Sequence, residues 1–190
     1  MNYKELFNRI VVLISSPAKA WEEISNETDK QKVMNGFVYL MIGLWGLAVF
    51  IGTFFGNSAD ANEAFTIAMR NCCSTFISLF GGFFLSAYLS NEVGKKLLNR
   101  TEEIELNRQF VGYAMVVVFV LEIISGLFSI SLLHWILQFY TVFVVYEGAR
   151  TLMKVDEQDL TRYSLIISLF IIACPAIISF LFAKLSLILN

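Results

Sequence analysis

The amino-acid sequence predicts an all-α polytopic integral membrane protein with five transmembrane helices. Three observations carry this prediction: an apolar composition, long stretches without a charged residue, and basic residues that gather on alternate loops. Of the 190 residues, 57% are hydrophobic and 16% are charged, whereas a soluble domain carries about 25% charged residues. The apolar excess indicates that lipid, rather than water, surrounds much of the chain.

Three charge-poor stretches are each long enough to cross a membrane as a helix. They cover approximately residues 33–56, 71–91 and 163–184, and the last carries only Lys184, at its end. About 20 apolar residues in a helix span the ~30 Å hydrocarbon core of a bilayer. We therefore expect each stretch to form one span.

A fourth apolar stretch, residues 110–146, is too long for a single crossing. Glu122 is its only formally charged residue. One helix of this length would measure roughly 55 Å at 1.5 Å per residue, far more than a bilayer. We expect two antiparallel spans, approximately 110–127 and 131–147, with the chain reversing between them.

The basic residues set the expected orientation. With five spans, twelve of the fourteen Lys and Arg residues fall on one side of the membrane. Because Lys and Arg are enriched in cytoplasmic loops, this side is expected to be cytoplasmic. The N-terminus is then in the cytoplasm and the C-terminus outside.

The segment before the first span, residues 1–32, is expected to form cytosolic interfacial helices, and residues 33–190 the membrane domain. Apolar side chains recur at three- and four-residue steps over residues 3–14, with charged residues between them. This spacing is typical of an amphipathic helix at a membrane surface. A serine followed by Pro17 predicts the start of a second short helix, whose apolar side carries Trp21.

Several function classes are disfavoured by the composition and by the motifs. A net charge near −2 gives no electrostatic attraction to nucleic acid, which is not expected as a partner. One histidine and three cysteines in apolar runs form no metal-binding pattern, and the common hydrolase and phosphate-loop motifs are absent. We therefore expect no catalytic residue, no cofactor, no metal and no enzyme activity.

A candidate polar site lies inside the predicted membrane domain. Glu122 falls about 13 residues into the third span, where an ionised carboxylate is costly. If the chain reverses near residue 128, His134 lies at the same depth on the next helix, and Gln138 lies one turn further on the same face. Two interpretations are open: a polar clamp that fixes the helix register, or a proton-sensitive or ion-binding site.

Small residues recur at every fourth position in the first two spans. The columns comprise Ala48, Gly52 and Gly56 in the first span, and Ser74, Ser78, Gly82, Ser86 and Ser90 in the second. Because such columns let helix backbones approach closely, we expect these two spans to pack through them. A hydroxyl-lined path for water or a solute is the alternative.

Three short motifs lie outside these columns. One contains Pro17 and Trp21 in the pattern SPxxxW. A second is Phe110–Tyr113, with Gly112, and a third runs from Tyr146 to Val155, with Gly148, and is followed by Tyr163. Together they resemble motifs of prokaryotic members of the Yip family, the Ypt/Rab-interacting membrane proteins. The resemblance implies five membrane helices, a cytosolic N-terminus and a non-enzymatic role. The eukaryotic Asp-Leu-Tyr-Gly-Pro signature is absent, so Rab binding is not carried over.

The sequence therefore favours a Yip-like, non-catalytic membrane protein that organises the membrane or binds protein partners through its cytoplasmic face. A small transporter or channel subunit that uses Glu122 and His134 is the alternative. The expected partners are the lipid bilayer and proteins at the cytoplasmic face, and formation of a homo-oligomer stays open. The expected location is the bacterial cytoplasmic membrane.

Overall fold

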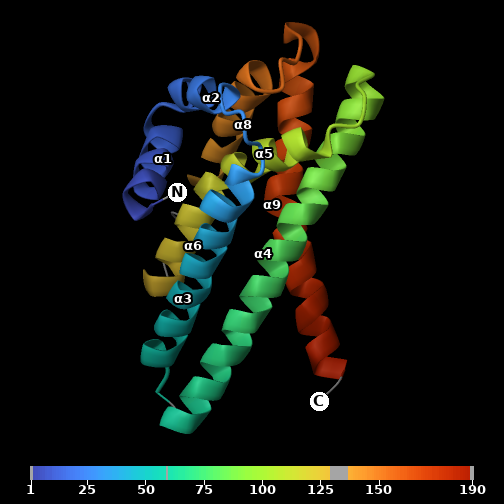
Figure 1. The fold of residues 1–190 in the computed structure, drawn as a ribbon. Coiled ribbons are helices and arrows are strands. Elements are labelled where there is room, and N and C mark those ends of the chain that lie inside the picture. The colour runs from blue at the N-terminus through green and yellow to red at the C-terminus, as the bar shows by residue number, and fades with distance from the viewer. Residues whose placement is uncertain (1, 59, 129–136, 189–190) are drawn as a thin grey trace.

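The computed structural model of the protein describes residues 2–58, 60–128 and 137–188, and the side chains of all of these except residues 128 and 186–188. The regular secondary structure of these residues is entirely helical, as predicted (Figure 1). In chain order, the elements are α1 (Tyr3–Ser15), α2 (Pro17–Ser25), the π-helix η1 (Met34–Val38), α3 (Tyr39–Gly56), α4 (Ala61–Leu98), α5 (Ile104–Ala114), α6 (Val116–Phe128), α8 (Tyr140–Thr151) and α9 (Glu157–Ile188).

Three helical segments are long and apolar enough to cross a membrane, namely Met34–Gly56, Ala61–Leu98 and Glu157–Leu185. The bent pair α5–α6 adds a fourth if it is taken as one span. The described residues therefore show three or four of the five predicted spans. The predicted span 131–147 lies partly outside the described residues, and α8, with 12 residues, is too short to cross a bilayer.

The second helix extends well beyond its predicted span of 71–91 because capping, rather than hydropathy, sets its ends. At the start of α4, the side chain of Asp60 accepts hydrogen bonds from the N–H groups two and three residues further on, at 3.0 and 2.9 Å. At its other end, Asn99 adopts a left-handed conformation with φ of 49°. Hydropathy locates the membrane portion of this helix and leaves out its polar ends.

The third predicted span, residues 110–127, begins earlier than expected and is bent. Helix α5 starts at Ile104, inside the predicted loop, and meets α6 at an angle of 42°. The break falls at Met115, whose ψ of −2° departs from the helical value of about −42°. As a result, α5 runs across the bundle while α6 runs alongside α3 (Figure 1).

The two N-terminal helices pack against the bundle. Helix α1 contacts α2 and α6, and α2 contacts α8. The side chains of Leu6 and Leu13 are buried on the inner side of α1. Pro17 is the first residue of α2, where its missing N–H costs no helical hydrogen bond. Helices α1 and α2 therefore belong to the packed structure.

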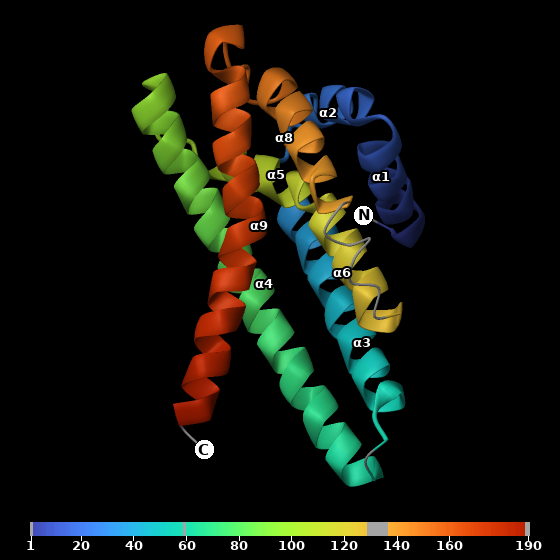
Figure 2. The ribbon, with the colours of Figure 1, turned by 180° about the vertical axis from the view of Figure 1, so that it is seen from behind.

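The core lies in the half of the molecule nearest α2. Helices α4 and α9 cross near their middles and diverge towards the opposite end, as the front and back views both show (Figures 1 and 2). The largest fully buried side chains include Trp21, Tyr113, Tyr163, Phe37, Phe83, Phe110 and Phe119. These side chains come from α2, η1, α4, α5, α6 and α9, so most of the helices are joined in this half.

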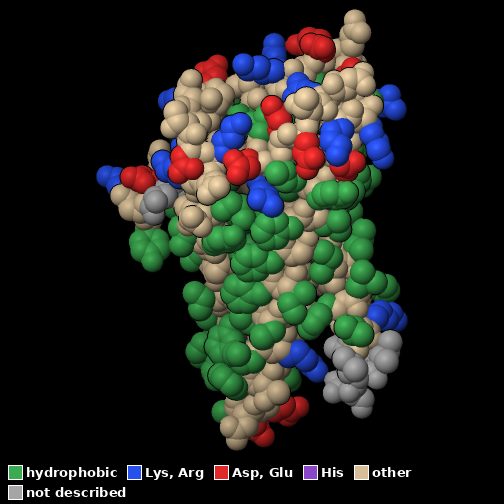
Figure 3. All heavy atoms as spheres, turned by 45° about the vertical axis from the view of Figure 1, so that its right-hand side comes forward, with side chains coloured by type: hydrophobic (Ala, Val, Ile, Leu, Met, Phe, Trp, Pro, Cys, Tyr) green, Lys and Arg blue, Asp and Glu red, His purple; other side chains and the backbone are tan. Residues whose placement is uncertain are grey.

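Most charged side chains gather at one end of the molecule, which we call the charged end (Figure 3). It is formed by residues 16–32, 92–109 and 147–162. Beyond it, hydrophobic side chains form a broad belt (Figure 3). On the long apolar helices, Leu47 and Phe55 of α3 and Leu169 of α9 are 58%, 78% and 62% exposed. Apolar patches of this extent are uncommon on soluble monomers. The protein is therefore an integral membrane protein whose helices contact lipid.

Candidate functional site

A buried tryptophan fastens α2 to the bundle at the charged end. The indole N–H of Trp21 donates a hydrogen bond of 2.9 Å to the carbonyl oxygen of Val144 in α8. Its ring centroid lies 5.7 Å from that of Phe110 and 6.3 Å from that of Tyr113, both in α5. Because a buried indole N–H needs a partner, this hydrogen bond fixes the ring in one orientation.

A glycine on α8 makes room for this tryptophan. A Cβ atom built at Gly148 would lie 2.5 Å from Trp21 Cε2 and 2.8 Å from Phe110 Cε2. These atoms belong to two rings that are themselves fully buried, so neither ring has free space to move into. Gly148 is therefore required for the close approach of α2 and α8.

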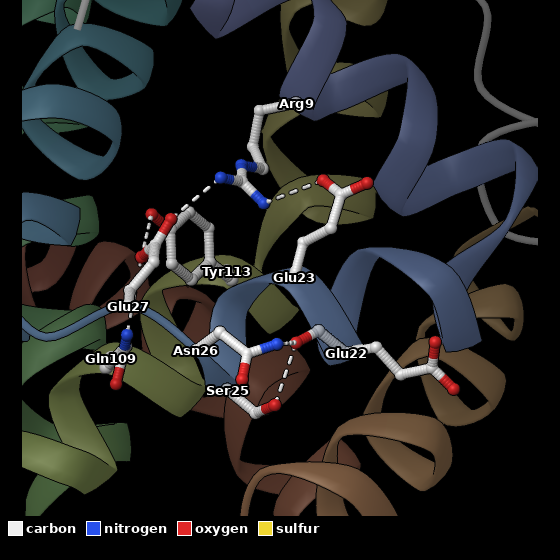
Figure 4. Close-up of polar contacts among 8 residues, drawn as sticks. All are labelled: Arg9, Glu22, Glu23, Ser25, Asn26, Glu27, Gln109 and Tyr113. Atoms are coloured by element: carbon white, nitrogen blue, oxygen red, sulfur yellow. Dashed lines mark hydrogen bonds and ion pairs between the residues drawn. The ribbon is translucent and has the colours of Figure 1, made fainter.

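A polar cluster lies next to this aromatic contact, and we call it the Glu27 cluster (Figure 4). It comprises Arg9 of α1, Glu23 of α2, Glu27 of the following loop, and Gln109 and Tyr113 of α5. Arg9 Nη2 donates to Glu27 Oε1 at 2.7 Å, and the Tyr113 hydroxyl donates to Glu27 Oε2 at 3.1 Å. The side chains of Arg9 and Glu27 are only 17% and 12% exposed.

The Glu27 cluster joins three parts of the chain through one carboxylate. The Arg9 guanidinium also lies 5.6 Å from the ring centroid of Tyr113 and 3.6 Å from a carboxylate oxygen of Glu23. Gln109 Nε2 donates to Glu27 at 3.4 Å. An additional tie holds the end of α1, where the Tyr140 hydroxyl donates to the carbonyl oxygen of Ile14 at 2.7 Å. The N-terminal segment is thus held by charge, hydrogen bonds and ring contacts together.

A second polar network lies between α4, α5 and α9. Ser90 Oγ donates to Asn107 Oδ1 at 2.7 Å and lies 3.2 Å from the Tyr163 hydroxyl. Asn91 Oδ1 accepts from the backbone N–H of Glu103 at 3.0 Å. Ser90, Asn91 and Asn107 are all buried, so these bonds replace those that water would make. The network positions the start of α5 across the bundle.

The motif residues singled out in the sequence meet at the charged end. Trp21, Tyr113 and Gly148 are in mutual or shared contact, and Pro17 is buried at the start of the same helix as Trp21. A Cβ atom at Gly112 would lie 2.9 Å from the side chains of both Val33 and Val38. Tyr146 is partly buried and packs against the core. Five of the six residues therefore lie at helix contacts or helix starts, and the sixth lies beside them.

The predicted intramembrane polar residues are described in part. Glu122 and Gln138 line one cavity of ≈270 Å³ between α3, α4, α6 and α9. Its other lining residues are Trp45, Thr75, Ser78, Val118, Ile172, Pro175, Ala176 and Ser179. His134 lies outside the described residues, so its contact with Glu122 stays a prediction. Two of the three candidate residues thus share one cavity.

The columns of small residues contact different helices. A Cβ atom at Gly52 would overlap the carbonyl group of Gly126 in α6, and Ala48 lies beside the same glycine. A Cβ atom at Gly82 would lie 2.7 Å from Cα of Pro175 in α9. At these positions the first column therefore faces α6 and the second faces α9, whereas we expected the two columns to face each other.

The remaining column residues take individual roles. Ser86 Oγ donates to the carbonyl oxygen of Phe170 in α9 at 3.0 Å, and Ser78 Oγ donates to Ser74 within α4. Ser90 belongs to the second polar network, and no atom lies within 4 Å of a Cβ built at Gly56. Helices α3 and α4 do contact each other. The glycine of α3 that lies against an α4 side chain is Gly46, which packs on Phe76 and does not belong to the predicted column.

Four members of the Glu27 cluster, Arg9, Glu23, Glu27 and Gln109, were not predicted from the sequence as site residues. Arg9 did carry a signal, since it lies three residues after Leu6 and four before Leu13, on the buried side of α1. A charged residue on the apolar side of an amphipathic helix needs a buried partner. Glu27 lies in a loop, and no local pattern distinguishes it from the other acidic residues nearby.

The chemistry of the site is ion pairing and hydrogen bonding. Among the described residues, no group of three or more His, Cys, Asp or Glu side chains is arranged to hold a metal ion. The hydrogen bonds that Glu27 accepts from Arg9, Gln109 and Tyr113 join segments that are 18 to 86 positions apart in the sequence. These contacts hold a surface segment on a membrane bundle.

A helical membrane bundle with an N-terminal segment fastened to its charged end defines the class of protein. The model of the Yip1 domain family matches residues 11–180, which include α2, the bent pair and most of α9. The chain therefore belongs to the Yip1 domain family, and the predicted resemblance is confirmed at the level of the family. This is generally a family of non-enzymatic membrane proteins. No curated protein and no solved structure matches the chain.

Proposed function

We propose that this Yip1-domain protein is a non-catalytic scaffold that organises the membrane or binds protein partners through its charged end. In this proposal the protein is of the prokaryotic type, has five spans and resides in a bacterial cytoplasmic membrane, as a single chain or a homo-oligomer. The charged end, with the N-terminus, faces the cytoplasm and the C-terminus lies outside.

The observation that carries the proposal is that α1, α2 and the loop that holds Glu27 are fastened to the bundle. Trp21 and the Glu27 cluster turn one side of α2 inwards, so the opposite side is left for contacts with other molecules. Lys19 and Glu22 are exposed on that outer side. A charged, positioned surface of this kind suits the recognition of a partner, because little conformational entropy is lost when it binds.

Two features support the proposed orientation. The charged end carries ten of the fourteen basic residues, and Lys4 and Arg9 of the adjoining α1 bring the number to twelve, an asymmetry typical of the cytoplasmic side. The C-terminal end of α9 lies at the opposite end of the molecule from α2 (Figure 1). One membrane crossing therefore separates the surface proposed to bind partners from the C-terminus.

Site-specific photocrosslinking in cells tests the proposal. A photoreactive residue in place of Lys19 is expected to give protein adducts, because this position lies on the outer side of α2. The same residue in place of Leu47, which lies in the apolar belt, serves as the matched control and is expected to give lipid adducts. Adding Trp21→Ala is expected to reduce the adducts at position 19 and leave those at position 47 unchanged. Lipid adducts alone at both positions would contradict binding of a protein partner.

A second candidate function is proton or ion conduction through the Glu122 cavity. The observation in its favour is that Glu122 and Gln138 line a cavity of ≈270 Å³ inside the predicted membrane region. In liposomes, this function requires a pH-dependent flux that Glu122→Gln abolishes. The scaffold proposal instead expects the same low permeability for both proteins.

A further inference from the structure

A cavity of ≈270 Å³ opens between η1, α4 and α5, and we call it the Arg108 pocket. Its lining includes the basic residues Lys30 and Arg108, the amides Gln31 and Asn35, and the aromatic residues Tyr39 and Phe84. None of these side chains belongs to the Trp21 contact, the Glu27 cluster or the Glu122 cavity. The pocket is therefore a separate feature of the charged end.

The two basic groups of the pocket are available to an anion. Among the described residues, neither Lys30 nor Arg108 forms an ion pair. The one acidic residue of the pocket, Glu105, accepts a hydrogen bond of 3.3 Å from Gln31 Nε2. The pocket thus carries two positive charges against one negative charge, and its amide groups supply further hydrogen-bond donors.

The aromatic residues place the pocket at the edge of the membrane. Tyr39 is 41% exposed and Phe84 is 39% exposed, and both belong to helices that are candidate spans. The Arg108 guanidinium lies 5.7 Å from the ring centroid of Phe84, so the charge and the apolar surface are adjacent. Basic and aromatic side chains together are typical of the headgroup region of a bilayer.

We propose that the Arg108 pocket binds the phosphate group of an anionic phospholipid. Lys30 and Arg108 contact the phosphate, and the acyl chains leave the pocket past Tyr39 and Phe84 towards the apolar belt. The cavity is smaller than the ~300–1,000 Å³ of pockets that enclose drug-sized ligands, so it takes the headgroup and leaves the chains in the bilayer. The chains distinguish this ligand from free phosphate, which has no contact with the aromatic residues.

This inference deepens the proposed function because it names a lipid partner of the charged end. It needs neither a protein partner nor a cytoplasmic orientation. Its test uses the purified full-length chain, so its failure and that of the scaffold proposal are separable.

Native mass spectrometry of the protein released from nanodiscs of phosphatidylglycerol and phosphatidylcholine tests the inference. The wild-type protein is expected to retain phosphatidylglycerol preferentially. The double variant Lys30→Gln/Arg108→Gln is expected to lose this preference by about 25-fold, since each basic residue near a membrane surface contributes roughly fivefold. The control double variant Lys19→Gln/Lys96→Gln makes the same change in net charge at exposed positions outside the pocket, and its preference is expected to change less than about twofold.

A variant with the opposite sign keeps the test independent of folding. Glu105→Gln removes the negative charge of the pocket and still accepts the hydrogen bond from Gln31, so retention is expected to rise several-fold. Equal losses in the two double variants, or no gain with Glu105→Gln, would overturn the inference. Displacement of the lipid by millimolar inorganic phosphate alone would also overturn it, because the site would then recognise the free anion.

Discussion

Gly148 acts through the space that it leaves for two aromatic rings. Its contacts to Trp21 and Phe110 would be shorter than a real Cβ atom allows, and both rings are fully buried. The same residue was singled out in the sequence only through a family resemblance. Its steric role depends on α2 and α8 being neighbours, which no local pattern of residues around position 148 reveals.

We expect Gly148→Ala to destabilise the protein by about 1–3 kcal/mol, the usual cost of overpacking a buried contact. Gly43→Ala is the matched control, because no atom lies within 4 Å of a Cβ at that position and alanine favours a helix over glycine by up to about 1 kcal/mol. Unfolding in mixed micelles, followed by tryptophan fluorescence, measures both free energies. Equal stability of the two variants would show that α2 tolerates a displacement from α8.

The Arg9–Glu27 pair is expected to be strongly coupled because both side chains are largely withdrawn from water. In a double-mutant cycle with Arg9→Met and Glu27→Gln, we expect a coupling energy of about 1–3 kcal/mol in the free energy of unfolding. The exposed pair Arg150–Glu157, with nitrogen and oxygen 3.6 Å apart, is the control, and its coupling is expected to stay below about 1 kcal/mol. Similar values for the two pairs would contradict a structural role of the Glu27 cluster.

At the scale of the elements, the hydropathy of the sequence predicts where helices cross the membrane, but not where they end or bend. It places one span over η1 and α3 and two others within α4 and α9, and the structure contains helices at all three places. It misses the break at Met115, because the residues around it remain apolar on both sides. The direction of α5 instead depends on Asn107 and its buried partners Ser90 and Asn91, which are 17 and 16 positions away in the sequence.

Helices α4 and α9 approach each other closely at Gly82, where a Cβ atom would lie 2.7 Å from Cα of Pro175. Gly82→Leu is expected to abolish folded protein, because the side chain would enter the backbone of α9 at Pro175. Gly43→Leu, which enters open space, is expected to leave the yield of folded protein unchanged. Size-exclusion chromatography in mild detergent measures the folded fraction. A Gly82→Leu protein that folds but has lost a solute flux shown by the wild-type protein in liposomes would favour a solute path along this column of small residues.

In the assembled molecule, the small-residue columns pack against helices that their spacing in the sequence does not identify. The columns of the first two spans mark close approaches of helix backbones, and Gly52 and Gly82 do lie at such approaches. The pattern cannot name the partner helix, since a column fits α6 or α9 as well as its neighbour in the sequence. The Glu27 cluster could not be predicted either, because its members come from three separate segments and the sequence does not show which segments meet.

The orientation of the whole molecule is accessible to thiol labelling. In a variant without the native cysteines, Lys19→Cys at the charged end and Glu63→Cys at the opposite end are expected to react with a membrane-impermeant reagent from opposite sides. Position 19 is expected to react from the cytoplasmic side, as the distribution of basic residues predicts. Labelling of both positions from one side would contradict the proposed topology, whatever the number of spans.

The length of α4 has a mechanical consequence for the molecule in its bilayer. At 1.5 Å per residue, its 38 residues reach about 57 Å, nearly twice the ~30 Å hydrocarbon thickness. The segment Met34–Gly56, with 23 residues, reaches only about 35 Å. Hydrophobic mismatch therefore acts chiefly on this shorter segment, whereas α4 overhangs the hydrocarbon and tolerates thinning or thickening of the bilayer by exposing more or less of its polar ends.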